Sequence, residues 1–84
     1  MEQRIGQVTH YFNRVRVAVL DLSGELRVGD TIHIQGRDVD FTQGVQSMEI
    51  EHQKVQVVGP HAEVALQVIQ PVRKGDAVFK VIAE

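Results

Sequence analysis

Two aromatic rings and two arginines lie close together near the start of the chain. Tyr11 and Phe12 precede Asn13, a residue typical of turns. Arg14 and Arg16 follow at the spacing that puts two side chains on one face of a strand. Ring stacking combined with guanidinium contacts is how small barrels hold unpaired nucleotides, so these four side chains are candidate contacts for RNA or another partner. The alternative is structural: a ring closes one end of a barrel, and the arginines keep a sheet face soluble.

Nucleophilic and acid–base catalysis have few candidate residues. The chain has no cysteine, and its two serines, Ser23 and Ser47, lie outside any G-x-S-x-G elbow. Glu49 and Glu51 would share one face of a strand, which suits acid–base chemistry but is more typical of a solvated surface. We therefore expect that this chain alone is not an enzyme.

Candidate metal ligands are also poorly spaced. Residues 38–49 place oxygen-bearing side chains as an EF-hand calcium loop does, but Gln43 occupies the position where that loop needs glycine. The histidines are at least nine residues apart, wider than the usual spacing of paired zinc ligands: His10, His33, His52 and His61. We predict no metal and no cofactor, with the histidines at the surface.

Length and composition indicate one small domain over residues 1–84. The chain is 43% hydrophobic but only 5% aromatic, so its core must consist of Val, Ile and Leu. Nine basic and eleven acidic residues give a formal charge of −2, whereas proteins that mainly neutralise phosphates are basic. The first residues lack the apolar segment of a signal peptide, and no run has membrane-spanning length. We expect a cytoplasmic protein that makes no membrane contact.

The apolar residues recur at every second position, which is typical of half-buried strands. Val15, Val17 and Val19 form one such set, and Ile32 and Ile34 form another on either side of a histidine. Such alternation places one set of side chains in the core and the other in water. The predicted strands lie at about residues 4–11, 14–21, 30–36, 43–52, 54–58, 62–69 and 77–82.

These short strands predict an all-β fold, a small six- to seven-stranded antiparallel β-barrel. Glycines within turn signals separate the strands, and Gly-Asp occurs twice, at residues 29–30 and 75–76, just before a run of β-formers. A helix over residues 45–57 is the alternative for that segment. Only two of the three residues at helical spacing there, Val45, Met48 and His52, are apolar.

Several segments resemble the second domain of the translational GTPases, the β-barrel that follows the G domain in elongation factor Tu. Residues 24–32, GELRVGDTI, are similar to a glycine-containing hairpin of that barrel, and residues 45–52, VQSMEIEH, to one of its strands. Residues 59–68 and 72–76 follow in the same order as the later turn, strand and ending of the family. The resemblance covers almost the whole chain and implies the same barrel.

The resemblance implies a non-enzymatic binding module in a translation-linked setting. Its expected partners are tRNA, rRNA or a translation-linked protein, held through Tyr11, Phe12, Arg14 and Arg16. The chain has no G-x-x-x-x-G-K-[ST] motif, so we expect it to bind no GTP alone. Similar barrels also occur as appendages of other enzymes, including collagenase-like peptidases. The alternatives are therefore a protein-interaction or assembly module, or an accessory domain that acts with a separate enzyme.

Overall fold

The computed structural model describes residues 1–82 of the 84-residue chain and contains strands, with no helix among those residues. The ten strands are β1 (Glu2–Phe12), β2 (Val17–Leu22), β3 (Leu26–Arg27), β4 (Thr31–Gln35), β5 (Asp40–Gly44), β6 (Met48–Ile50), β7 (Gln53–Val55), β8 (Val57–Val58), β9 (Glu63–Gln67) and β10 (Ala77–Val81). All the pairings are antiparallel. The prediction of an all-β antiparallel fold is confirmed.

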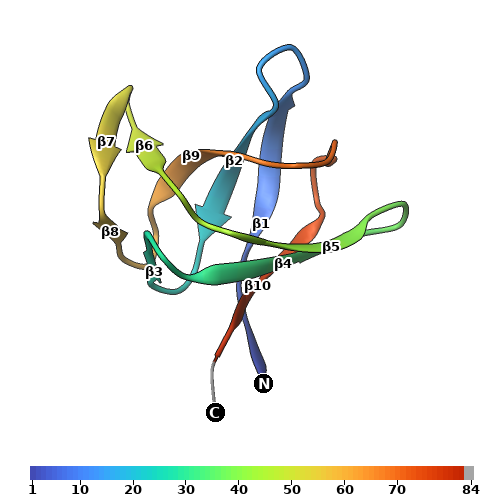
Figure 1. The fold of residues 1–84 in the computed structure, drawn as a ribbon, viewed down its shortest axis with the longest axis horizontal. Helices are drawn as coiled ribbons and strands as arrows, with labels where there is room; N and C mark the ends of the chain where they lie inside the picture. Colours follow the sequence, from blue (N-terminus) through green and yellow to red (C-terminus); the bar gives the residue numbers. More distant parts are fainter. Residues whose placement is uncertain (83–84) are drawn as a thin grey trace.

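The barrel closes because one curved segment pairs with a different strand at each of its ends. The hydrogen-bonded order is β5-β4-β10-β1-β2-β9-β6-β7, and β5 and β6 are consecutive parts of residues 40–50. β5 pairs with β4, whereas β6 pairs with β9, so the segment joins the two ends of the sheet (Figure 1). This gives six positions around the barrel, within the predicted range of six to seven strands.

The remaining strands form a flap beside the barrel. The strand predicted over residues 54–58 is divided into β7, which pairs with β6, and β8, which pairs with β3. The turn between β6 and β7 contains two residues with positive φ, Glu51 at 51° and His52 at 66°. Glu49 and Glu51 therefore do not share a strand face, because β6 ends before Glu51.

The core consists mainly of Val, Ile and Leu, as the composition predicts, with one alanine, one methionine and one phenylalanine. The inward side chains of β2 are Ala18, Leu20 and Leu22, all at most 1% exposed. Val17 and Val19 point to the outer face, so placing this valine set in the core is wrong. The phase of the alternation changes at the preceding turn, where Arg16 has a φ of 58°. The buried hydrophobic residues are Ile5, Val8, Ala18, Leu20, Leu22, Leu26, Ile32, Ile34, Phe41, Val45, Met48, Val58, Val64, Leu66, Val68, Val72 and Val78.

Two turns of the sequence form Arg-x-Gly-Asp repeat the same geometry. In residues 27–30 the Asp30 amide donates to the Arg27 carbonyl at 3.0 Å, and a carboxylate oxygen of Asp30 accepts from the Arg27 amide at 2.9 Å. Residues 73–76 form the corresponding bonds at 3.1 and 2.9 Å. The glycines have φ values of 102° and 95°, which favour glycine over other residues. Each turn therefore fixes the entry into the strand that follows.

The two ends of the described chain lie side by side. Glu2 pairs with Val81, and the Ile82 amide donates to the Met1 carbonyl at 2.8 Å. Figure 1 shows β1 and β10 extending together below the barrel. The first and last strands are therefore neighbours along most of their length.

A methyl group at Gly6 should destabilise the barrel. A Cβ there would lie 2.2 Å from the Asp21 carbonyl oxygen, where β1 and β2 approach closely. We expect Gly6→Ala to lower the free energy of unfolding by about 2 kcal/mol or more, measured by urea denaturation. Gly44→Ala is the matched control, because its Cβ would meet nothing within 4 Å. Equal stability of the two variants would contradict the close approach.

Candidate interaction surface

The predicted binding residues lie at the hairpin that joins β1 and β2, but they do not all face solvent. Tyr11 is partly buried and packs against the core. Phe12 is 49% exposed, and Arg14 and Arg16 are exposed in the turn over residues 13–16. This turn projects at the top of the molecule in Figure 1. The structure therefore brings a ring and two arginines together at the surface, while the Tyr11 ring contributes to the core.

Apolar side chains continue from Phe12 over the outer face of three strands. Phe12 on β1 pairs with Val17 on β2, and Val19 pairs with Ala65 on β9. Their inward neighbours are core residues, so these four side chains lie on the outside of the barrel. The His10 ring lies 4.5 Å from the Phe12 ring, between centroids. We call this set, Phe12, Val17, Val19 and Ala65, the apolar strip.

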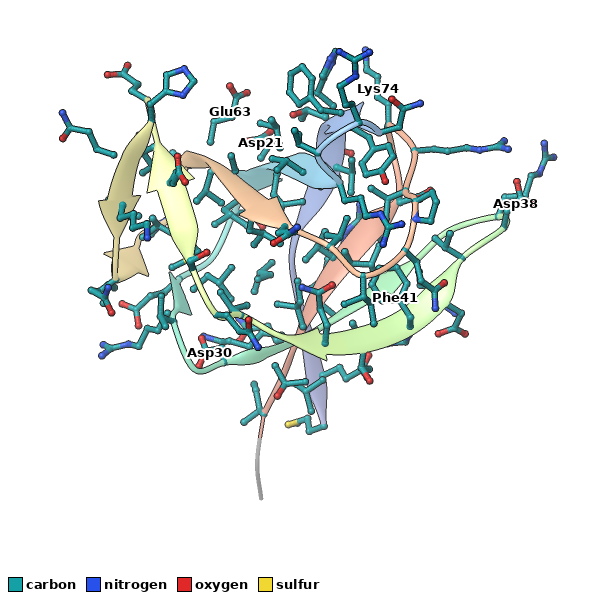
Figure 2. The ribbon with its side chains drawn as sticks, turned by 45° about the horizontal axis from the view of Figure 1, so that its top comes forward. Asp21, Asp30, Asp38, Phe41, Glu63 and Lys74 are labelled. Carbon is teal, nitrogen blue, oxygen red and sulfur yellow. The ribbon has the colours of Figure 1, made fainter. Side chains whose placement is uncertain are left out.

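Two carboxylates lie at the end of the apolar strip that is distant from the hairpin. Asp21 and Glu63 are paired residues on β2 and β9, and both are exposed. Figure 2 shows them next to each other over these strands. Like charges directly opposite each other are unfavourable in a sheet. Within residues 1–82 neither carboxylate has an ion-pair partner, and neither do Arg14 and Arg16 at the other end.

A hollow lies where β5 and β9 diverge. Its volume is about 330 Å³, and its lining includes Arg16, Ser47, Leu66 and Ile69. The side chain of Gln43 spans the divergence: its amide nitrogen donates to the Gln67 carbonyl at 2.9 Å, and its oxygen accepts from the Ile69 amide at 2.8 Å. One side chain thus replaces a pair of ladder bonds and holds the barrel closed at this point. From the sequence alone, Gln43 stands out only as a residue that does not fit a calcium loop.

A histidine on the opposite side of the barrel lies between two carboxylates. The His33 Nδ1 is 2.8 Å from a Glu2 oxygen, and its Nε2 contacts Asp40. Its neighbours Ile32 and Ile34 are fully buried, so His33 faces outward as expected. Hydrogen bonds to Glu2 and then to Asp40 raise the pKa of His33 above its ordinary value, because both favour the charged imidazolium.

Other candidate chemistry is not assembled in the described part of the chain. No group of three or more His, Cys, Asp or Glu side chains within residues 1–82 could hold a metal ion. None of the described residues belongs to a helix that could cross a membrane. Asp38 lies in the turn before β5, and Asp40 and Glu49 lie along the curved β5–β6 segment, so these carboxylates are not in a helix-flanked loop.

The comparisons with known proteins point to protease-family proteins. No family model matches the chain. An uncharacterized protease of Methanocaldococcus jannaschii is 34% identical over 76 residues, which make up 89% of this chain. The chain spans only 19% of the length of that relative. The similarity therefore concerns one segment of a much longer protein.

Solved structures share the barrel. The C-terminal domain of a U32 peptidase-family protein from Geobacillus thermoleovorans superposes with a TM-score of 0.87 at 21% identity, covering 93% of this chain and 91% of that domain. Its selenomethionine variant gives a TM-score of 0.86 at 20% identity, with 90% and 96% covered. At this identity, the likeness shows a common fold.

The identification with the translation-factor barrel is wrong, and so is the RNA-binding translation function drawn from it. The archaeal relative and the two solved structures described above carry protease-family names, not the name of a translation factor. The motifs behind the resemblance include the two Arg-x-Gly-Asp turns and buried residues such as Met48, which barrel geometry itself requires. The alternative of an accessory domain acting with an enzyme fits the relatives better. The individual partners expected from the resemblance stay predictions, as does a binding role for Tyr11, Phe12, Arg14 and Arg16.

Loss of the Gln43 amide should weaken the closure of the barrel. Gln43→Ala removes both bonds between β5 and the end of β9, and we expect it to cost about 1–2 kcal/mol of unfolding free energy. Gln46→Ala is the matched control, since Gln46 is exposed on the same segment and has no hydrogen bond within residues 1–82. Chemical denaturation of both variants measures the difference. A loss that is equal in both would contradict the closing role of Gln43.

The His33 ion pairs should make stability depend on pH. The folded-state pKa lies above the ordinary value of 6.5, so the stabilisation is fully present below that pH and disappears as the pH rises through the raised pKa. We expect His33→Gln to be less stable than the wild type near pH 6 and the gap to narrow toward pH 9, in thermal unfolding. His52→Gln, which changes an exposed histidine, is the control. A gap that widens as the pH rises would contradict the assignment.

Proposed function

We propose that this chain is a non-catalytic accessory domain that acts with the catalytic part of a protease-family protein. The observation that carries the proposal is the 34% identity, over nearly the whole chain, with one segment of a much longer uncharacterized protease. The barrel shared with the C-terminal domain of a U32 peptidase-family protein supports it. The domain would bind and position, while another domain would supply the catalysis.

The chemistry of the described side chains supports a binding role over a catalytic one. The Ser23 side chain lies in the turn after β2, and Ser47 lines the open hollow beside Gln43. His33, whose pKa is raised, lies between two carboxylates and not beside a serine. A serine nucleophile needs a base within hydrogen-bond reach. The chain offers instead a closed barrel with an apolar strip on its outer face.

The proposal is tested with the archaeal relative and this chain as separate molecules. The relative is produced without the segment that matches this chain, and the two proteins are mixed in analytical ultracentrifugation. We expect a one-to-one complex at about 10–100 micromolar, because the chain would fill the place of the missing domain. The full-length relative is the control, since its own segment occupies that place.

A second measurement addresses catalysis directly. The isolated chain is incubated with casein as the probe, and we expect no hydrolysis above buffer. Cleavage by the purified chain alone would overturn the non-catalytic role. Absence of a complex with the shortened relative, or equal binding to the full-length one, would overturn the accessory role.

A further inference from the structure

The apolar strip differs from an ordinary solvated barrel face. Outward positions on a half-buried sheet are usually polar, and His10, Gln67 and Glu49 fill the outward positions paired with Val19, Val17 and Ala65. Between these polar residues, Phe12, Val17, Val19 and Ala65 still adjoin one another across β1, β2 and β9. Phe12 remains 49% exposed, although the His10 ring stacks near it. A contiguous apolar set bounded by charges is typical of an interaction site.

The strip is bounded by opposite charges that lack partners. At the hairpin end lie Arg14 and Arg16, of which Arg16 also lines the hollow beside Gln43. At the other end lie the paired carboxylates of Asp21 and Glu63. Within residues 1–82 none of the four side chains forms an ion pair. Asp21 follows Arg16 by five positions, which corresponds to about 17 Å along an extended strand. The two charges therefore lie at opposite ends of one apolar patch.

This order of charges makes the strip complementary to itself. Consider a two-fold axis that lies in the plane of contact, runs perpendicular to β2 and passes between Val17 and Val19. It would place the arginines of one copy over the carboxylates of the other. The valines would then meet at the centre, and Phe12 would be covered. Because the interface is isologous, each charge contact would occur twice. We infer that the outer face of β1, β2 and β9 is a dimerisation surface whose partner is a second copy of this chain.

A dimer would explain why two carboxylates lie opposite each other on β2 and β9. In a single copy Asp21 and Glu63 repel each other across β2 and β9, which costs stability. In the dimer, the guanidinium groups of the second copy would lie between them. Glu63→Lys should therefore make the single barrel more stable while it weakens the dimer. A residue with only a structural role in the barrel would not change the two quantities in opposite directions.

The test is the oligomeric state of the chain and its charge variants. Sedimentation from about 5 to about 500 micromolar should show a monomer–dimer equilibrium that weakens as salt rises. Arg14→Glu and Glu63→Lys should each weaken the dimer about tenfold, because each change acts at two symmetric contacts. The fourfold variant Arg14→Glu/Arg16→Glu/Asp21→Lys/Glu63→Lys exchanges the charges of the two ends and should recover most of the affinity. Thermal unfolding checks that every variant is folded.

Matched controls separate this face from the rest of the surface. Arg37→Glu removes an exposed arginine in the turn between β4 and β5, and Val57→Ser removes a valine that is 47% exposed on β8. Neither variant should change the dissociation constant of the dimer, whereas Phe12→Ser should raise it. A monomer at every concentration, a fourfold variant as weak as the single ones, or equal effects of the controls would overturn the inference. None of these results depends on the archaeal relative, so failure here leaves the proposed accessory function to its own test.

Discussion

Closure of the barrel depends on one curved segment, residues 40–50, that pairs with two different strands. Residues 40–50 pair with β4 at their start and with β9 at their end, so the sheet has no gap there only while both pairings hold. The ladder is interrupted between β5 and β6, and the Gln43 side chain supplies the two missing contacts to Gln67 and Ile69. The position of β9, and with it the outer face that carries the apolar strip, follows from this closure.

The fold could be predicted because strand alternation and turns are local signals. Ile32, Ile34, Val64 and Leu66 are buried as their spacing indicates, and Gly29 has the positive φ that its turn requires. The phase of β2 could not be predicted, since the positive φ of Arg16 changes which residues face inward. Closure by Gln43 could not be predicted either, because it depends on β9, a strand more than twenty residues away.

The surface was harder to predict than the core, for a physical reason. A buried position is constrained by volume, whereas an exposed one is constrained only by its partner, which the sequence of one chain does not contain. The hairpin residues illustrate this: Tyr11 and Phe12 are adjacent aromatic residues, yet one packs on the core and the other lies outside. The motifs behind the expected resemblance to translation factors coincide with turns of this barrel, such as the two Arg-x-Gly-Asp turns. They do not identify a function, because one fold can carry many functions.

The neighbouring ends of β1 and β10 have a consequence for how such a unit can be combined with other chains. Because Ile82 is hydrogen-bonded to Met1, the chain enters and leaves the barrel at one place. A unit of this kind can be inserted into a surface loop of a host protein with little change in the spacing of that loop, and the entropy cost of closure grows only slowly with length. The same geometry would allow a short linker to join the two ends and new termini to be opened in the hairpin turn.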